Sequence, residues 1–370
     1  MVRAHRLPGC ELCGRTDQPV MGALGVCRDC ATEGYSASQS RIRDAHAANR
    51  RRFELPGTPP RAPRGAKCPL CSRECSIGLG ERGFCGLRVA VPSRSGGLRI
   101  RHLAGRPSRG LLHAYHDPLP TNCVADWVCP GHRQHGLRNL AVFYASCTLN
   151  CLGCQNWRFR ESDPRNDGGM TADELARCAD ARTFCVCFFG GDPASQMPHA
   201  LATARRLASR GVRICWETAG TQNQRLMEEA VELSLATGGI VKFDLKALDE
   251  RLHVALTGGG NERTLANFAR AAARAVERRE PPLVVASTLL VPGYVTPDEV
   301  AAIARFIASV DPSTPYALLA FAPSFAASDL PFTSRRHAEE ALAAARGEGL
   351  QRIRIGNEHL LDTERGGMLH

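Results

Sequence analysis

The stretch NLAVFYASCTLNCLGC, residues 139–154, decides how the rest of the chain is interpreted. It begins as an apolar run of strand type and passes directly into Cys147, Cys151 and Cys154, which have the spacing C-x3-C-x2-C. Three thiolates on one short loop can bind three irons of a 4Fe–4S cube and leave the fourth iron open. Zinc sites usually close with a fourth protein ligand, and none lies nearby in the sequence. The pattern therefore predicts a 4Fe–4S cluster directly after a strand.

Downstream of this loop, strand-type runs alternate with helical patterns. The apolar runs lie at 139–146, 184–191, 212–218, 239–247, 283–291, 316–323 and 351–356. The helical patterns between them include 172–181, 199–211, 223–238, 264–279, 297–310 and 334–349. Such alternation is typical of parallel βαβ units. Six or seven units predict an α/β fold with a full or partial (β/α) barrel over residues 136–362, and an open doubly wound sheet is the alternative.

The three-cysteine loop resembles that of the radical S-adenosylmethionine (SAM) superfamily. Its continuation CQNWRFR (154–160) is similar to the glycyl-radical-enzyme activating enzymes and their relatives. Further pieces agree with this branch: HDPLPTNC (116–123), FFGGDP (188–193), CWETAGT (215–221), FDLKA (243–247), LVPGYV (290–295) and RIGNEHLL (354–361). Upstream, KCPLCSREC (67–75) and GFCGLR (83–88) resemble the front segment of AmmeMemoRadiSam-type relatives. The resemblance covers roughly residues 65–362.

The resemblance implies an enzyme in which the open iron binds SAM. Reduction of the cluster then cleaves SAM to a 5′-deoxyadenosyl radical, which abstracts hydrogen from a substrate, and no catalytic residue is expected beyond the cluster ligands. The expected SAM contacts are Gly190, Gly191, Asp192, Glu217, Thr218, Asp244, Lys246 and Ser287. Superfamily members usually carry an aromatic residue before the third cysteine, packed on the adenine. Here that position is Gly153, so Trp157 or Phe189 is expected to take over the adenine contact.

A row of charged residues occupies the run VKFDLKA (241–247). Lys242, Asp244 and Lys246 have the same parity, so their side chains point to one face of the strand. Helices cover the outer face of a barrel, so this row must line the lumen near its C-terminal mouth. Charges there are costly unless they are paired or bound to a ligand. The pattern indicates either a buried Lys–Asp–Lys network or contacts from Asp244 and Lys246 to the ribose or carboxylate of SAM.

The first of two cysteine sets at the front of the chain resembles a zinc ribbon in its spacing. It has two C-x2-C pairs separated by 13 residues: Cys10, Cys13, Cys27 and Cys30. Paired knuckles of this kind are typical of tetrahedral zinc. We expect residues 1–35 to bind a structural zinc ion on which SAM cleavage barely depends, with a rubredoxin-like iron site or no metal as alternatives.

The second set has the spacing C-x2-C-x3-C-x9-C within a cysteine-rich front module, residues 67–135. Its members are Cys68, Cys71, Cys75 and Cys85. The spacing suits zinc or an auxiliary 4Fe–4S cluster, with a slight preference for zinc. Cys123 and Cys129 stand as a separate pair, either as buried free cysteines or as extra ligands or a redox-active thiol. The remaining cysteines are expected in the core: Cys178, Cys185, Cys187 and Cys215.

Positive charge is concentrated in the N-terminal part of the chain. Residues 1–110 hold 20 Lys and Arg against 8 Asp and Glu, whereas the remaining residues hold 27 against 29. Residues 36–66 are expected to form a basic helix, opened by a serine cap, and a Pro/Arg-rich linker, and residues 90–138 are expected to be irregular. The charge asymmetry indicates contact with something acidic, such as nucleic acid, an acidic protein or phosphates, or an Arg-rich face in contact with solvent.

The overall composition excludes several classes of protein. No apolar run approaches the roughly 18–20 residues of a membrane span, and the start MVRAHRLPGC has no apolar core of a signal peptide. We therefore expect a cytoplasmic enzyme whose 17 cysteines are reduced thiols. A one-electron donor such as flavodoxin or ferredoxin is implied as a partner.

Three functions follow from these observations. The first is an activating enzyme that acts on a glycyl-radical or other protein partner. The second is radical modification of RNA or protein recruited by the basic, zinc-bearing N-terminus. The third, from another class, is a catalytically inactive metal-binding adaptor, and the intact three-cysteine loop argues against it.

Overall fold

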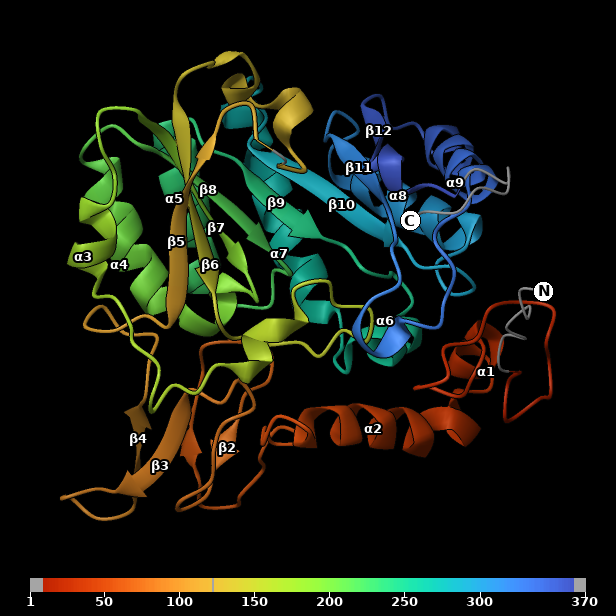
Figure 1. The fold of residues 1–370 in the computed structure, drawn as a ribbon, viewed down its shortest axis with the longest axis horizontal. Helices are drawn as coiled ribbons and strands as arrows, with labels where there is room; N and C mark the ends of the chain where they lie inside the picture. Colours follow the sequence, from red (N-terminus) through yellow and green to blue (C-terminus); the bar gives the residue numbers. More distant parts are fainter. Residues whose placement is uncertain (1–8, 122, 363–370) are drawn as a thin grey trace, which may run out of the picture.

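The computed structural model describes residues 9–121 and 123–362 and is built around one eight-stranded sheet (Figure 1). Its strand order is β12-β11-β10-β9-β8-β7-β6-β5. The strands are β5 (Leu112–Pro118), β6 (Arg138–Tyr144), β7 (Thr183–Gly190), β8 (Arg213–Thr218), β9 (Val241–Asp244), β10 (Val284–Leu290), β11 (Tyr316–Ala320) and β12 (Ile353–Gly356). Strands β6 to β12 are parallel, and only β5 runs antiparallel, against β6. The predicted α/β fold is confirmed.

The order of the strands decides between the expected architectures. Strands β6 to β12 lie side by side in the order of the chain, whereas a doubly wound sheet reverses its order at a switch point. Among the described residues β5 and β12 are unpaired edges, so the barrel is partial and open between them. Right-handed crossovers between sequential parallel strands place the connecting helices on one face.

Most of the connecting helices begin with a side-chain cap, and their apolar sides pack on the sheet. They are α3 (Ala172–Arg177), α4 (Met197–Ala208), α5 (Gln224–Thr237), α6 (Glu250–Thr257), α7 (Glu262–Ala273), α8 (Pro297–Val310) and α9 (Arg335–Gly347). Helix α8 begins at Thr296, whose hydroxyl accepts from the Glu299 amide, and buries Val300, Ile303 and Ile307 at helical spacing. Short 3-10 turns complete the fold: Asp126–Val128, Pro130–Arg133, Trp157–Glu161, Pro193–Gln196, Arg274–Glu277, Phe325–Ala327 and Glu358–Leu360.

The N-terminal part lies along the end of the sheet at which the parallel strands finish (Figure 1). Helix α1 (Arg28–Thr32) contains Cys30, the last cysteine of the first set. Helix α2 (Tyr35–Arg51) runs from there to a module of two small hairpins (Figure 1). The hairpins are β1 (Ala66–Lys67) with β2 (Ser76–Ile77), and β3 (Arg88–Pro92) with β4 (Leu98–His102). The expected serine cap of α2 is wrong, because Gly34 occupies the N-cap without a side-chain hydrogen bond.

The expectation that residues 90–138 are irregular is also wrong. This segment contains most of β3, all of β4 and all of β5, so the main sheet begins at Leu112 rather than at residue 136. Exposed positions in β5 alternate with less exposed ones over Leu112–His116, and only Leu112 is buried, as suits an edge strand. No helix in residues 9–121 and 123–362 combines the length and the apolarity that crossing a bilayer requires.

Candidate active site

A cavity of about 240 Å³ lies where the loop after β6 meets the carboxyl ends of β7, β8 and β9. Its wall contains all three cysteines of that loop and most of the expected SAM contacts: Cys147, Cys151, Cys154, Gly190, Gly191, Asp192, Glu217, Thr218, Asp244 and Lys246. Ser287 is the exception, because it stands opposite Asp244 in the β9–β10 register and its hydroxyl donates to Asp244 Oδ1 (3.0 Å) behind the wall. Carboxyl ends of parallel strands are where such folds place ligand sites.

The cysteine loop is fixed by the end of α6. The Asn150 amide donates to the Thr257 carbonyl (2.8 Å) and the Leu152 amide donates to the Leu256 carbonyl (3.0 Å). Burial raises the pKa of the Cys147 and Cys151 thiols above the ordinary value. These buried thiols stay protonated unless a cation holds them as thiolates.

The donor set fits a 4Fe–4S cluster with an open iron. The three sulfurs do not all lie within 4.8 Å of one another, which is too wide for one tetrahedral ion and suits a polynuclear cluster. Among the described residues, the cavity wall holds no fourth cysteine and no histidine. The cavity is large enough for a ligand beside the loop, which an open coordination position requires.

The double glycine after β7 allows two backbone segments to approach closely. A Cβ at Gly191 would lie 2.2 Å from the Ser146 carbonyl oxygen, and a Cβ at Gly190, whose φ is +103°, would lie 2.7 Å from the Tyr144 nitrogen. The Gly191 amide donates to the Tyr144 carbonyl (2.8 Å). The glycines are therefore needed to bring the end of β7 against the residues that precede Cys147.

Asp192 ties together the ends of β7 and β8. Its carboxylate, in a residue that is 3% exposed, accepts from the amides of Ala194 (2.7 Å) and Ala219 (2.8 Å) and from the Thr218 hydroxyl (3.0 Å). Burial raises the pKa of Asp192 above its ordinary value. Its immediate role is to hold the cavity wall in place.

The charged row on β9 is a paired network that also lines the cavity. Lys242 Nζ lies 2.7 Å from Asp244 Oδ1 and 3.1 Å from Glu217 Oε2, its register partner on β8, and Lys246 Nζ lies 3.2 Å from Asp244 Oδ2. Burial acts to raise the pKa of Asp244, but the two lysines and the Ser287 hydroxyl hold it well below its usual range. Lys246 has one carboxylate partner and a side chain that is 25% exposed, so part of its ammonium faces the cavity.

The position before the third cysteine is closed to a side chain. A Cβ at Gly153 would lie 2.9 Å from the Phe321 ring, which fills that space from the end of β11. Of the two aromatic residues expected to replace it, Phe189 lines the cavity. Trp157 instead stacks on Phe325 (centroids 5.4 Å apart) and is not part of the wall.

Comparison with known proteins agrees with this geometry. Residues 141–307 match the family model described as Radical SAM superfamily. This stretch is a radical SAM domain.

The most similar curated proteins include two isethionate sulfite-lyase activating enzymes. That of Oleidesulfovibrio alaskensis is 34% identical over 128 residues, which is 34% of this chain and 38% of the relative. That of Desulfovibrio desulfuricans is 34% identical over 135 residues, which is 36% of this chain and 40% of the relative. The match thus spans little more than a third of these relatives.

Solved structures with a similar arrangement were also found. A domain of pyruvate-formate lyase-activating enzyme from Bacteroides vulgatus has a TM-score of 0.38 and 21% identity, covering 47% of this chain and 99% of that one. Streptococcus suis SuiB bound to S-adenosylmethionine has a TM-score of 0.44 and 13% identity, covering 60% and 52%.

The first cysteine set has the geometry of a single-ion site. Sulfur atoms of Cys10 and Cys30 lie 3.7 Å apart and those of Cys13 and Cys27 lie 3.8 Å apart, and all four lie within 4.8 Å of one another. Zinc–sulfur bonds of about 2.3 Å in a tetrahedron place the sulfurs about 3.8 Å apart. The donor set therefore fits the expected zinc ion.

This ribbon packs on the radical SAM domain and reaches its cavity. Met21, which is 0% exposed, is part of the cavity wall. Its amide donates to the Tyr294 hydroxyl (3.0 Å), which in turn donates to the Val26 carbonyl (2.7 Å), and the Gly22 amide donates to Asp329 (2.7 Å). No local signal in the sequence predicts the place of Met21, because the contact joins segments far apart in the chain.

The isolated cysteines gather beside Glu217. The Cys123 and Cys187 sulfurs lie 3.5 and 3.8 Å from Glu217 Oε1. Burial raises the pKa of both thiols well above the ordinary value, so both are protonated. Cys185 and Cys187 are buried as expected, Cys129, Cys178 and Cys215 are half-buried, and Cys178 donates to the Glu174 carbonyl within α3.

Proposed function

We propose that this chain is a radical SAM enzyme, with a 4Fe–4S cluster on Cys147, Cys151 and Cys154 and SAM in the adjoining cavity. When bound, the cluster supplies the single electron that cleaves SAM reductively. One observation carries the proposal: a single cavity combines three thiols of one loop with the glycine edge of β7 and the charged row of β9.

The chain's own residues bind and orient the ligand. The ammonium of Lys246 faces the cavity and offers donors to the SAM carboxylate, while Asp244 and Glu217 are placed to accept from ribose hydroxyls. Glycines 190 and 191 line the cavity, so their backbone would meet the amino group. Leu256, Leu289 and Val291 line the same cavity and exclude water from it. No proton transfer by a side chain is needed for the cleavage.

The test is SAM cleavage by the full chain. Protein reconstituted anaerobically with iron and sulfide should release 5′-deoxyadenosine from SAM when a strong reductant is added. Replacement of Cys147, Cys151 and Cys154 together by Ala should abolish the product, whereas Cys178→Ala should not, because Cys178 is the C-cap of α3 and is not part of the cavity wall. Cleavage at the parental rate by the triple variant would refute the proposal. Absence of cleavage by the parental chain, with its cluster present, would instead favour the inactive adaptor.

We further propose that the enzyme activates a partner protein by hydrogen abstraction. Support comes from the 34% identity to two isethionate sulfite-lyase activating enzymes over 128 and 135 residues. A flavodoxin or ferredoxin would supply the electron, the ribbon would hold zinc, and the reaction would take place in the cytoplasm. The test is the transfer of deuterium from a labelled partner glycine into 5′-deoxyadenosine.

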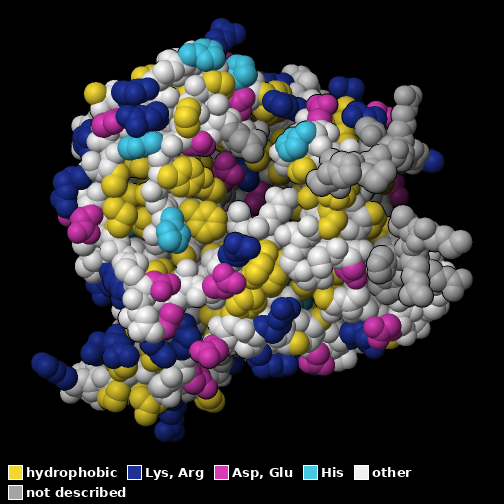
Figure 2. Space-filling model, in the orientation of Figure 1, with side chains coloured by type: hydrophobic (Ala, Val, Ile, Leu, Met, Phe, Trp, Pro, Cys, Tyr) yellow, Lys and Arg dark blue, Asp and Glu magenta, His cyan; other side chains and the backbone are white. Residues whose placement is uncertain are grey.

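RNA modification is the second candidate, because basic side chains gather on the front module. Figure 2 shows Lys and Arg side chains over β3 and β4, and exposed residues there include Arg94, Arg99 and Arg101. RNA binding of this kind weakens steeply with salt. A gel-shift titration with single-stranded RNA at two salt concentrations tests it, and no shift at low salt would exclude it.

A further inference from the structure

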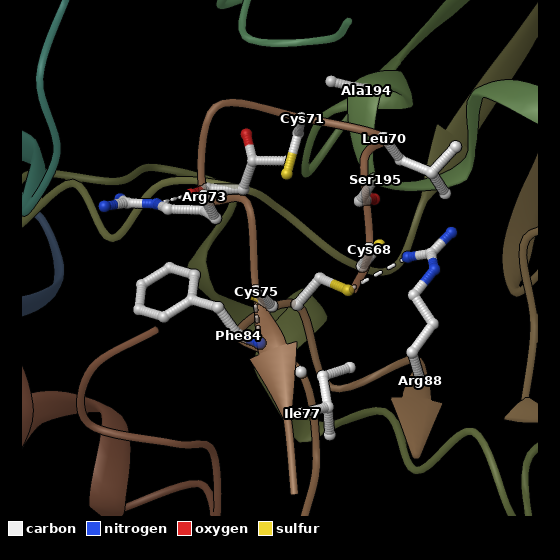
Figure 3. Close-up of a pocket in the computed structure, with 13 residues that line it drawn as sticks. Cys68, Leu70, Cys71, Arg73, Cys75, Ile77, Phe84, Arg88, Ala194 and Ser195 are labelled. Atoms are coloured by element: carbon white, nitrogen blue, oxygen red, sulfur yellow. Dashed lines mark hydrogen bonds between the residues drawn. The ribbon is translucent and has the colours of Figure 1, made fainter. Parts of the chain in front are cut away.

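The second cysteine set encloses a pocket between the front module and the radical SAM domain. Cys68, Cys71, Cys75 and Cys85 all line it, and Thr148, Ala194 and Ser195 close it from the domain side. Figure 3 shows Cys68, Cys71 and Cys75 around this space, with Arg88 reaching in from one side. The set is thus assembled around one centre, with three members from the connection between β1 and β2 and Cys85 from the turn before β3.

The charges around this pocket require an anion. Arg73 and Arg88 line it, and its wall contains no carboxylate among the described residues. Arg88 is 2% exposed, and its Nε and Nη2 have no hydrogen-bond partner, as is also true of Arg73 Nη2. A third buried guanidinium, Arg50, stacks on Phe84 and donates to carbonyls. Buried cations without anions are costly, and four neutral thiols would not balance them.

The thiols already accept hydrogen bonds that suit thiolates. Arg88 Nη1 donates to Cys85 Sγ (3.0 Å), and the Phe84 amide donates to Cys75 Sγ (3.4 Å). Both donors are buried, so each bond is made away from water. Hydrogen bonds to ligand sulfurs are among the features that tune iron–sulfur clusters.

The sulfurs of the second set are more widely spaced than those of the ribbon. In the zinc ribbon the four sulfurs lie within 4.8 Å of one another. Within the described residues that ribbon is the one such group, so no three sulfurs of the second set approach this closely. The second set shares this wide spacing with Cys147, Cys151 and Cys154.

We propose that Cys68, Cys71, Cys75 and Cys85 bind a second 4Fe–4S cluster, not the zinc ion that the sequence slightly favoured. It would lie next to the first cluster site, because the Ser146 hydroxyl donates to the Cys85 carbonyl (3.0 Å) and Cys85 and Cys147 line the same small cavity. The proposal goes beyond SAM cleavage and does not depend on it.

The test uses the full chain purified anaerobically, with iron, sulfide and zinc measured per chain. The triple variant that replaces Cys147, Cys151 and Cys154 by Ala should keep about four irons and one zinc, and reduction with dithionite should give the electron paramagnetic resonance signal of a 4Fe–4S cluster. Adding Cys68→Ser and Cys75→Ser to it should remove the iron and the signal. Adding Cys178→Ser instead, as a matched control, should remove neither.

Two zinc ions and no iron in the triple variant would overturn the proposal, as would the spectrum of a 2Fe–2S cluster. Should that variant fail to fold, the parental chain decides, because it should hold about eight irons and one zinc rather than about four irons and two zinc. Failure of SAM cleavage with eight irons present would refute the proposed function and leave the second cluster in place.

Discussion

Lys246 and Lys242 belong to one network but should respond differently to loss of their charges. Among the described residues Lys246 pairs with one carboxylate, that of Asp244, and it faces the cavity. Lys242 instead bridges Asp244 and Glu217, with a side chain that is 6% exposed. In Lys246→Met, Asp244 keeps Lys242 and the Ser287 hydroxyl, so stability should change little. Loss of one hydrogen bond to a charged ligand group costs about 1.5–3 kcal/mol. The affinity for SAM should therefore fall roughly 10- to 150-fold.

Lys242→Met is the matched variant. It leaves the buried side of Asp244 and Glu217 without a cation, and breaking a buried pair costs about 3–5 kcal/mol of unfolding free energy. SAM affinity is measured by equilibrium dialysis under anaerobic conditions and stability by denaturant unfolding, with iron content as the control in both variants. If Lys246→Met bound SAM as the parent does but unfolded more easily, Lys246 would be a structural ion-pair member and its assignment to SAM would be wrong.

Three further predictions concern the cavity wall and the ribbon that packs against it. Gly191→Ala should lower the unfolding free energy by at least about 1–3 kcal/mol, because its Cβ would collide with the Ser146 carbonyl. Gly168→Ala is the control, because a Cβ there would meet no atom within 4 Å. Denaturant unfolding measures both variants. Tyr294→Phe removes the two hydrogen bonds that the Tyr294 hydroxyl makes to the ribbon, worth about 1 kcal/mol each, so SAM affinity should fall by up to roughly 30-fold. The exposed Tyr115→Phe is the control, and unchanged SAM affinity in Tyr294→Phe is the contrary result. Folding lowers the pKa of Asp244. Its stabilising contribution is therefore complete above the unfolded pKa of about 3.9 and is lost as pH falls below that value. In Asp244→Asn the unfolding free energy should fall less steeply with decreasing pH in this range, which denaturant unfolding at several acidic pH values measures.

The sequence was most informative where periodicity and chemistry coincide. The run at 139–146 covers all of β6 but its first residue, and the run at 239–247 contains β9, because buried parallel strands are nearly continuous apolar runs. Parity placed Lys242, Asp244 and Lys246 on one face, and the structure brings all three to the cavity. The two interpretations of this row turned out to be compatible, because paired charges can still face a ligand.

What the sequence could not supply were contacts between distant segments. Strand β5 was missed because its polar, histidine-rich edge pattern lacks the apolar signal of the central strands. Ser287 was expected at the cavity, but the register with Asp244 places it behind the carboxylate. The docking of the ribbon could not be foreseen: Met21 forms part of the wall, and the expectation that SAM cleavage barely depends on the ribbon stays a prediction. Register and docking are set by tertiary packing, which residue spacing does not encode.

The distribution of buried arginines links the front module to the radical SAM domain. Arg50, Arg73 and Arg88 surround the second cysteine set, while Arg160, 5% exposed, lies in the cavity wall beside the first. Arg73 donates to the carbonyls of Thr148 (2.6 Å) and Gly258 (2.6 Å), so it bridges the module, the cysteine loop and the end of α6. Such cations are stable only beside anions, and metal binding is what converts the buried thiols into thiolates. Metal loading should therefore stabilise both halves together, because each anionic centre offsets charges that the other half contributes.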